Sequence, residues 1–175
     1  MSRLVFVDET SAYVGIASEY GWAPSCERVI DTKPKGKKQR VSLIAACSLN
    51  AATAEQALLL PESVDKNAFL GYLEHSLLPT LEPGSILVMD NWTVHHGDDV
   101  KGLVEAAGCE LLYLPTYSPD FNPIEHLFAK VKAFVKNLRP DSVDELVQAF
   151  CDALKTITPD NVLKSFIHCG YEVVQ

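Results

Sequence analysis

The sequence predicts an α/β fold, with a mixed five-stranded sheet in which an antiparallel meander precedes parallel strands and helices flank both faces. Short connections join the β-forming runs in the first third of the chain, which favours antiparallel pairing. From residue 85 onward, strand-like and helix-like segments alternate, which is typical of parallel strands joined by right-handed crossovers. Two continuous apolar runs have the composition of strands covered on both faces, and each ends on an aspartate.

The meander is expected from the β-forming runs near the N-terminus. Residues 3–8 (Arg-Leu-Val-Phe-Val-Asp) indicate a buried central strand with Asp8 at its terminus. The segment 25–39 is polar, basic and broken by Pro34 and Gly36, which indicates a loop or hairpin tip. Further strands are expected over residues 13–23, over residues 40–49 and, as a strand or a loop edge, over residues 54–60.

Helices dominate the second half of the expected fold. Asp65 is a suitable N-cap for the first helix, and Gly108 is a suitable C-cap for the second. Helices are expected over residues 66–78, 98–108, 122–138, 142–154 and 158–170, with strands over 85–90 and 110–114. The residues expected to face the core from the third helix are Leu127, Val131, Phe134 and Leu138.

Composition limits the class of protein. A chain of 175 residues with 47% hydrophobic and 22% charged residues is expected to form one globular domain. No apolar run has the length needed to span a bilayer, and the first residues lack the order of a signal peptide, so a cytoplasmic location without a membrane partner is expected. The five cysteines form no C-x-x-C pair, which argues against a zinc site and a disulfide framework.

The formal net charge of -8 disfavours a nucleic-acid partner when taken alone, because affinity for the phosphate backbone comes largely from Lys and Arg. The basic residues are clustered, however. Nine of the fifteen lie in two stretches: Lys33, Lys35, Lys37, Lys38 and Arg40, then Lys130, Lys132, Lys136 and Arg139. A basic run is commonly only a solvated face, so these stretches point to DNA only in combination with other features.

Three acids form the candidate site. Asp8 and Asp90 end predicted strands, and Glu125 falls in the first turn of a predicted helix. Groups just past the carboxyl ends of strands line the crevice where α/β sheets bind ligands, and Mg²⁺ prefers carboxylate oxygens. Each acid also has a purely structural interpretation, since Asp8 and Asp90 can form turns and Glu125 can complete a capping box.

Asn122 and Pro123 suit the N-cap and the first position of the helix that carries Glu125. We expect Asn122 alone to cap this helix and Glu125 to point toward the aspartates. Lys132 and Lys136 each fall within about 20° of Glu125 on a helix of 3.6 residues per turn. One helix face therefore carries a carboxylate and two ammonium groups, which suits a metal-bound phosphate backbone or an ordinary solvated surface.

Four segments of the sequence form a recognisable set: Phe-Val-Asp-Glu-Thr (6–10), Tyr-Gly-Trp-Ala-Pro (20–24), Val-Met-Asp-Asn-Trp-Thr-Val-His (88–95) and Leu-Pro-Thr-Tyr-Ser-Pro-Asp-Phe-Asn-Pro-Ile-Glu (114–125). They resemble the catalytic domain of DDE transposases, and most of all the mariner-related bacterial insertion-sequence transposases. The resemblance runs from about residue 4 to residue 138, and the 34 residues between Asp90 and Glu125 are a separation typical of that superfamily.

The resemblance implies a ribonuclease H-like fold and a site in which Asp8, Asp90 and Glu125 hold two Mg²⁺ ions, with Mn²⁺ as a substitute. It implies metal-dependent cleavage of a DNA strand and strand transfer by the freed 3′-OH. Asn91 and His95 match family residues that follow the second acid. They are expected to orient that acid or touch DNA, with a structural role as the alternative for His95.

The implied partners are double-stranded DNA, both transposon ends and target, and a second copy of the chain in the active complex at the bacterial nucleoid. Asn122 is expected to support Glu125. Family members carry an N-terminal helix-turn-helix region, which is absent from this chain, so residues 1–175 are expected to be a single catalytic domain. The expected DNA contacts are Lys35, Lys37, Lys38, Arg40, Lys132 and Lys136.

Two other hypotheses remain open at this point. A haloacid-dehalogenase-like phosphatase would use Asp8 as nucleophile with Thr10 nearby, although the second aspartate of that motif is replaced by Thr10. A transposase remnant would bind DNA or self-associate without chemistry. DNA cleavage would support the transposase, an aspartyl-phosphate at Asp8 would support the phosphatase, and a gel shift without cleavage would support the remnant.

Overall fold

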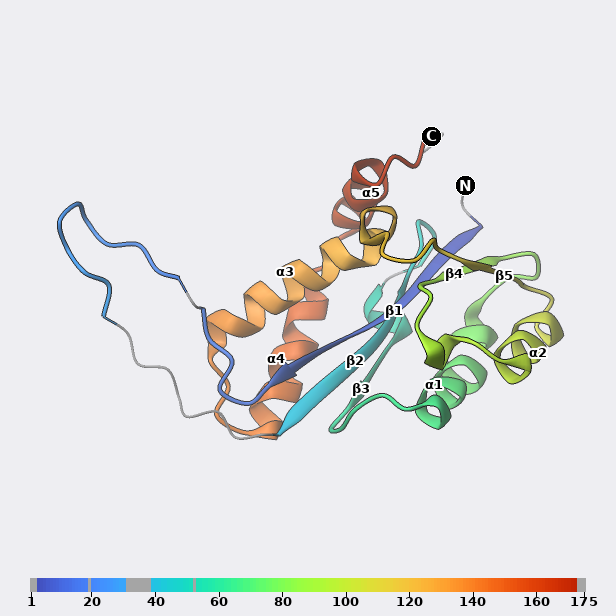
Figure 1. Ribbon diagram of the computed structural model, residues 1–175, viewed down its shortest axis with the longest axis horizontal. Coiled ribbons are helices and arrows are strands. Elements are labelled where there is room, and N and C mark those ends of the chain that lie inside the picture. Colours follow the sequence, from blue (N-terminus) through green and yellow to red (C-terminus); the bar gives the residue numbers. More distant parts are fainter. Residues whose placement is uncertain (1–2, 19, 31–38, 52, 173–175) are drawn as a thin grey trace.

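The computed structural model describes residues 3–18, 20–30, 39–51 and 53–172, and its centre is a twisted mixed sheet (Figure 1). Within the described residues the sheet has five strands in the order β3-β2-β1-β4-β5. The strands are β1 (Leu4–Tyr13), β2 (Arg40–Cys47), β3 (Ala57–Leu60), β4 (Ile86–Met89) and β5 (Glu110–Tyr113).

Strand directions follow the predicted order of pairing. β1 and β2 pair antiparallel, as do β2 and β3, whereas β1–β4 and β4–β5 are parallel pairs. The antiparallel meander therefore precedes the parallel units along the chain, which confirms the predicted mixed sheet.

One of the strands predicted for the antiparallel meander is not present among the described residues. Residues 14–18 and 20–23 form no strand, so the strand expected over residues 13–23 is wrong. β1 instead runs on through Asp8 to Tyr13, because residues beyond Asp8 still pair with β2 in the register Thr10↔Leu43. The chain then turns away from the sheet at Gly15, whose φ of 80° is readily adopted only by glycine. The fifth strand is β3, within the segment left open as a strand or loop edge.

Helices cover both faces of the sheet (Figure 1). One face packs against α1 and α2, and the other packs against α3, α4 and α5. The α-helices are α1 (Lys66–Tyr72), α2 (Asp98–Ala106), α3 (Pro123–Leu138), α4 (Val143–Lys155) and α5 (Pro159–His168). Short helical turns are η1 (Thr53–Gln56), η2 (Leu73–Leu77), η3 (Leu78–Thr80), η4 (Thr93–His95) and η5 (Pro119–Phe121). Among the described helices, none is long and apolar enough to cross a membrane.

The first helix is shorter than expected in its α-helical part. Asp65 caps it as predicted, because its Oδ1 accepts a hydrogen bond from the backbone N–H of Ala68 at 2.8 Å. The α-helix ends at Tyr72, and the chain reaches Thr80 through the wider turn η2 and the tighter turn η3.

The buried face of α3 is rotated from the one predicted. Leu127 and Val131 are buried as expected, but Phe134 is only half-buried and Leu138 is 54% exposed. The helix fills the core instead through Pro123, Ile124, Leu127, Phe128, Val131 and Val135. The predicted buried face included Phe134 and Leu138 because both are apolar. The face that is buried is rotated about the helix axis, away from these two residues.

Alternation along β1 decides which side chains can meet. Phe6 belongs to the core beneath α3, α4 and α5, whereas Val5 and Val7 belong to the core beneath α1 and α2. Successive side chains of a strand point to opposite faces. Asp8 therefore shares the α3 side of the sheet, and Glu9 shares the α1 side.

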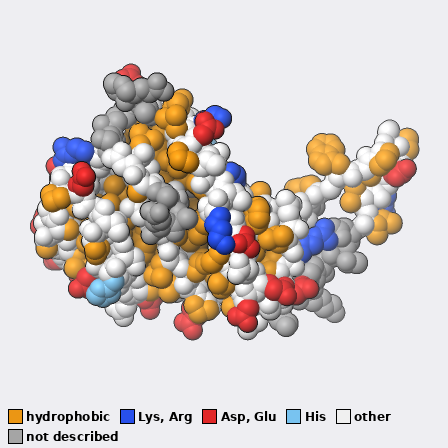
Figure 2. Space-filling model, turned by 180° about the vertical axis from the view of Figure 1, so that it is seen from behind, with side chains coloured by type: hydrophobic (Ala, Val, Ile, Leu, Met, Phe, Trp, Pro, Cys, Tyr) orange, Lys and Arg blue, Asp and Glu red, His pale blue; other side chains and the backbone are white. Residues whose placement is uncertain are grey.

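An arm made of residues 20–30, between β1 and β2, projects away from the body (Figure 1). Apolar side chains gather on it in the space-filling view (Figure 2). Tyr20, Trp22 and Ile30 are 90%, 102% and 88% exposed. Large apolar groups in this position are unusual for a free surface and are typical of a contact with another macromolecule.

Candidate active site

The register between β1 and β4 brings two of the three predicted acids together. Their parallel pairing ends at Val7↔Met89, so the next residues, Asp8 and Asp90, are neighbours at the same edge of the pair. Asp8 continues in β1, paired with Ala45, and is not the strand end that the sequence suggested. Asp90 directly follows β4, as expected.

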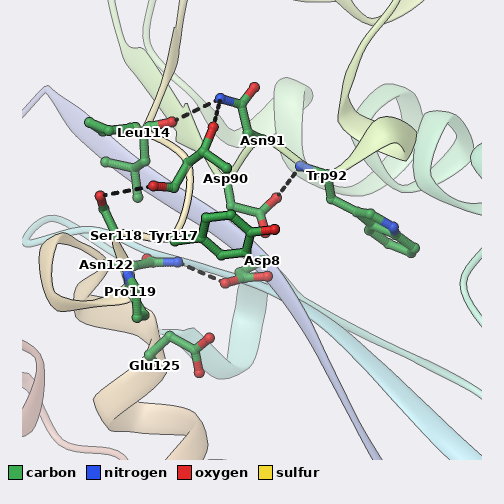
Figure 3. Close-up of a pocket in the computed structure, with 12 residues that line it drawn as sticks. Asp8, Asp90, Asn91, Trp92, Leu114, Tyr117, Ser118, Pro119, Asn122 and Glu125 are labelled. Carbon is green, nitrogen blue, oxygen red and sulfur yellow. Dashed lines mark hydrogen bonds between the residues drawn. The ribbon is translucent and has the colours of Figure 1, made fainter.

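Glu125 reaches the same place from the first turn of α3. It lines, together with Asp8 and Asp90, a pocket of about 350 Å³ at the carboxyl end of β4. Its side chain is exposed, and Figure 3 shows it below the Asp8 carboxylate. Three acids that are distant in the sequence therefore face one pocket.

Asp8 is the most perturbed acid of the three. Burial, and after it the neighbouring carboxylates of Glu9, Glu125 and Asp90, raise the pKa of Asp8 to about 7, against the stabilising backbone N–H of Glu9. That N–H donates to Asp8 Oδ1 at 2.7 Å. Negative charge in this pocket is thus poorly compensated by the protein alone.

Asp90 lies in the opposite electrostatic environment. A hydrogen bond with His95 is the main reason that the pKa of Asp90 is lowered from its ordinary value. His95 Nδ1 lies 2.7 Å from Asp90 Oδ1, and the backbone N–H of Trp92 donates to the same oxygen at 2.9 Å. Asp90 is therefore held as an anion in one orientation.

His95 is fully buried between two carboxylates. Its Nδ1 faces Asp90, and its Nε2 lies 3.0 Å from each carboxylate oxygen of Glu9. Burial lowers the pKa of His95, but the hydrogen bonds to Asp90 and Glu9 outweigh it and raise the pKa to about 10. The ring is an imidazolium that donates to both acids, and it is tilted by 42° to the ring of Phe69, with the ring centroids 4.6 Å apart.

Glu9 is the residue that the sequence analysis missed. Its side chain is 9% exposed and completes a chain from Glu9 through His95 to Asp90. The alternation of side chains along a strand could have identified Glu9. An acid next to Asp8 must point to the opposite face of the sheet, where it needs a cationic partner. The partner is 86 residues away in sequence, so the pairing depends on the fold.

Asn122 does not cap α3 as expected. Its side chain makes no capping hydrogen bond, and Nδ2 instead donates to Asp8 Oδ2 at 2.7 Å. The carboxylate of Asp8 is a strong acceptor for the Asn122 N–H group, and this hydrogen bond holds the side chain toward Asp8. The Oδ1 atom of Asn122 is buried without a hydrogen-bond partner.

The capping-box contact of Glu125 is also absent. The backbone N–H of Asn122, which that contact would use, donates to the carbonyl of Pro119 at 2.9 Å. The Glu125 carboxylate is thereby available to the pocket. Asn122 supports the site through Asp8, not by fixing the helix.

Asn91 connects the end of β4 to the loop that precedes α3. Its Nδ2 donates to the carbonyl of Leu114 and to Thr116 Oγ1, each at 3.3 Å. The loop that leads toward Glu125 is therefore attached directly beside Asp90.

Two of the predicted basic residues flank the acids. Arg40 and Lys132 line a neighbouring groove of about 560 Å³, to which Asp8, Asp90 and Glu125 also contribute. Lys136 lies one turn beyond Lys132 on α3 and is half-buried. The remaining expected DNA contacts, Lys35, Lys37 and Lys38, lie outside the described residues.

The donor set suits a hard divalent cation. Within the described ranges, no group of three His, Cys, Asp or Glu side chains already has the spacing of a metal site. The chemistry nevertheless fits, because three carboxylates line one pocket. Burial, and after it the neighbouring carboxylates, raise the pKa of Asp8, and a cation would offset both effects.

Solved structures of a transposase share this fold. A Mos1 strand transfer complex matches with a TM-score of 0.74 at 20% identity, over 95% of this chain and 51% of that one. A Mos1 mariner paired end complex with Mn matches with a TM-score of 0.75 at 19% identity, over 95% of this chain and 52% of that one. The catalytic domain of Mos1 mariner transposase matches with a TM-score of 0.61 at 17% identity, over 99% of this chain and 85% of that one. This likeness confirms the expected ribonuclease H-like fold.

Two curated relatives match in sequence. The transposable element Tc3 transposase of Caenorhabditis elegans is 38% identical over 80 residues, 45% of this chain and 24% of that protein. The transposable element Tcb2 transposase of Caenorhabditis briggsae is 26% identical over 108 residues, 59% of this chain and 39% of that protein. The matched segments thus span less than half of either relative.

A family model described as DDE superfamily endonuclease matches residues 3–147, which include all three acids and the loop before α3. Nothing in these comparisons supports the phosphatase hypothesis for Asp8 and Thr10. Since the match covers most of the sequence, the chain belongs to the DDE superfamily endonuclease family.

Proposed function

We propose that this chain is the catalytic part of a DNA transposase, in which Asp8, Asp90 and Glu125 bind two Mg²⁺ ions, or Mn²⁺ in their place. The observation that carries the proposal is the register of β1 and β4, which makes Asp8 and Asp90 neighbours beside Glu125. Membership of the DDE endonuclease family and the Mn complex of the Mos1 mariner transposase support it.

When bound, the two cations would supply Lewis acidity and a hydroxide or alkoxide nucleophile for in-line displacement at phosphorus. The chain's own residues prepare the site. Asn122 and the Glu9 backbone N–H hold the two oxygens of Asp8 in place. His95 and Trp92 hold Asp90 as an anion. Glu125, on the rigid first turn of α3, completes the set from the opposite side.

The groove beside the acids gives the DNA backbone a path. It shares Arg40 with an adjoining depression that Tyr13 also lines, so the hollow surface continues from the acids along β1 and β2. Arg40 and Lys132 would neutralise phosphates next to the reacting one. Double-stranded DNA, both transposon ends and target, is the proposed partner, and the Mos1 strand transfer and paired end complexes support this assignment.

The proposed active complex is a homodimer. The projecting arm supports this, because Trp22 and Tyr20 are almost fully exposed and have no covering element among the described residues. A second copy that covers the arm would remove these apolar groups from water.

DNA cleavage tests the proposal. Plasmid DNA that carries the ends of the cognate element is incubated with the protein and Mg²⁺ or Mn²⁺, and nicking and strand transfer are followed on gels. We expect metal-dependent cleavage that Asp8→Asn, Asp90→Asn and Glu125→Gln each reduce by about 10³-fold or more. The exposed Glu105→Gln, on α2, is the matched control and should retain full activity.

Full activity in any of the three acid variants would contradict the proposal. Binding of the same DNA in a gel shift without cleavage in either metal would favour the remnant hypothesis instead.

A further inference from the structure

We infer that Tyr171, just after α5, is a positioning residue for the acidic site, because it ties the turn before Glu125 to the strand that carries Asp8. The inference rests on the proposed function, since it takes the three acids as ligands of the same metal ions. It extends the site to a part of the chain beyond residues 3–147, the range that the family model matches.

The end of α5 fixes the backbone of Tyr171. Gly170 has a φ of 83°, in the left-handed region that glycine adopts readily, and turns the chain back over the last helical turn. The backbone N–H of Tyr171 donates to the carbonyl of Phe166 at 3.0 Å. The backbone N–H of Gly170 donates to the carbonyl of Ile167, also at 3.0 Å. These two hydrogen bonds form a Schellman motif, which places the residue after the glycine against the helix.

The ring of Tyr171 packs on the strand that carries the first acid. Its centroid lies 5.2 Å from the ring centroid of Phe6 and 5.8 Å from that of Phe166. Phe6 is fully buried in β1, two residues before Asp8, and therefore points to the same face of the sheet. The position of Tyr171 is thus fixed relative to the part of β1 that leads to Asp8.

The hydroxyl group of Tyr171 reaches the turn before α3. It donates to the backbone carbonyl of Phe121, the last residue of η5, at 2.8 Å. The next residue is Asn122, whose side chain donates to Asp8. Glu125 follows in the first turn of α3. One hydrogen bond therefore connects Tyr171 to the segment that supports one acid and presents another.

The loop over residues 115–121 has little burial to hold it in place. Its side chains are all exposed, except that of Ser118, which is half-buried. Segments with few buried contacts open at low free energy, so individual hydrogen bonds decide their position. Asn91 holds the start of this loop through the carbonyl of Leu114, and Tyr171 holds its end.

Mn²⁺ titration followed by electron paramagnetic resonance tests the inference in Tyr171→Phe, which removes the hydroxyl group and keeps the ring. We expect this variant to bind Mn²⁺ about 3- to 10-fold more weakly than the wild type, because Asn122 and Glu125 are held less firmly. Amide hydrogen exchange, followed by mass spectrometry, should become faster in peptides that span residues 119–125 and stay unchanged in those from β4.

Tyr72→Phe is the matched control. It removes a tyrosine hydroxyl group that also donates to a backbone carbonyl, that of Gln56, at 2.8 Å, but on the α1 side of the sheet. Tyr72 is fully buried, so this variant should lower the melting temperature at least as much as Tyr171→Phe, with Mn²⁺ affinity unchanged. Equal Mn²⁺ affinity of the wild type and Tyr171→Phe, or an equal loss in both variants, overturns the inference.

DNA nicking by the wild type in Mg²⁺ is measured separately. Nicking together with unchanged Mn²⁺ affinity in Tyr171→Phe refutes the positioning role and leaves the proposed function standing. Weaker Mn²⁺ binding in Tyr171→Phe without nicking by the wild type supports the positioning role and counts against the proposed catalysis.

Discussion

At the scale of single residues, the site consists of acids in contrasting environments. Asp8 is buried among other carboxylates, and its pKa is raised to about 7. Asp90 has its pKa lowered through the hydrogen bond with His95, which Glu9 holds from the other side. Burial, and after it the neighbouring carboxylates, disfavour the charged form of Asp8, whereas the hydrogen bond with His95 favours the charged form of Asp90.

Removal of the Asp8 charge is expected to stabilise the protein in the absence of metal. The unfolded state loses the Asp8 proton near pH 4 and the folded state near pH 7, so stability falls as pH rises through this window. Above pH 7 the penalty is on the order of 4 kcal/mol. In Asp8→Asn, Asn122 can rotate its amide so that its unpartnered Oδ1 accepts from the new Nδ2.

Thermal unfolding in a chelator measures this effect. We expect Asp8→Asn to melt well above the wild type at pH 8, with the difference disappearing toward pH 4. Asp120→Asn removes an exposed carboxylate from the loop before α3, and it should change the melting temperature little at either pH. A lower melting temperature for Asp8→Asn at pH 8 would refute the account of Asp8.

Glu9 is expected to act through His95 on Asp90. Glu9→Gln removes one of the two carboxylates that keep His95 charged, so Asp90 is held less firmly. Mutation of a residue that orients a metal ligand without touching the metal typically lowers metal affinity by about 10–100-fold. Mn²⁺ titration followed by electron paramagnetic resonance should show such a loss, with Glu105→Gln unchanged. Unaltered Mn²⁺ affinity in Glu9→Gln would mean that Glu9 has no role, through His95, in positioning Asp90.

At the scale of elements, β1 and α3 carry the site. β1 places Asp8 and Glu9 on opposite faces, and α3 presents Glu125 at its first turn. The stiff loop before α3 and the fixed register of β1 with β4 set the distances among the acids. Both elements are held from behind by the core beneath α3, α4 and α5.

The revised buried face of α3 can be tested with one matched pair. Leu127→Ala removes a side chain that is 3% exposed and should cost about 2–5 kcal/mol of unfolding free energy. Leu138→Ala removes the same groups from a position that is 54% exposed and should cost less than about 0.5 kcal/mol. Urea denaturation measures both, and equal losses would restore the face first predicted from the sequence.

Elements were predicted well where the signal was local. Hydrophobic runs located the strand that carries Asp8 and the strand that precedes Asp90, and Asp65 was correctly identified as a cap. The strand expected over residues 13–23 was wrong because, among its described residues, only Tyr13 pairs in the sheet, and it does so as the end of β1. Asn122 was wrong as a cap because its true partner, Asp8, is 114 residues away.

At the scale of the whole molecule, the acidic chain has an apolar arm and a groove in which Arg40 and Lys132 lie beside the acids. The net charge of -8 is offset locally by Arg40 and Lys132 beside the acids. The sequence named Arg40 and Lys132 as DNA contacts, but their place in one groove with the acids and the exposure of the arm depend on the fold. The three acids could be named from the sequence, and their proximity required the sheet register.

The arm is expected to mediate self-association. Trp22→Ser removes an exposed apolar group and should weaken the dimer that forms on DNA, whereas Ile167→Ser, at a 57% exposed site on α5, should not. Analytical ultracentrifugation of the protein with and without DNA ends gives the dimer fraction. An unchanged dimer fraction in Trp22→Ser would remove the arm from the interface.

The most direct test of the account is a crystal of the protein soaked in Mn²⁺ and measured at a wavelength where manganese scatters anomalously. The account predicts two anomalous peaks in the pocket, with Asp8 contacting both and Asp90 and Glu125 completing the coordination. Peaks elsewhere, or none while the three carboxylates point apart, would contradict it.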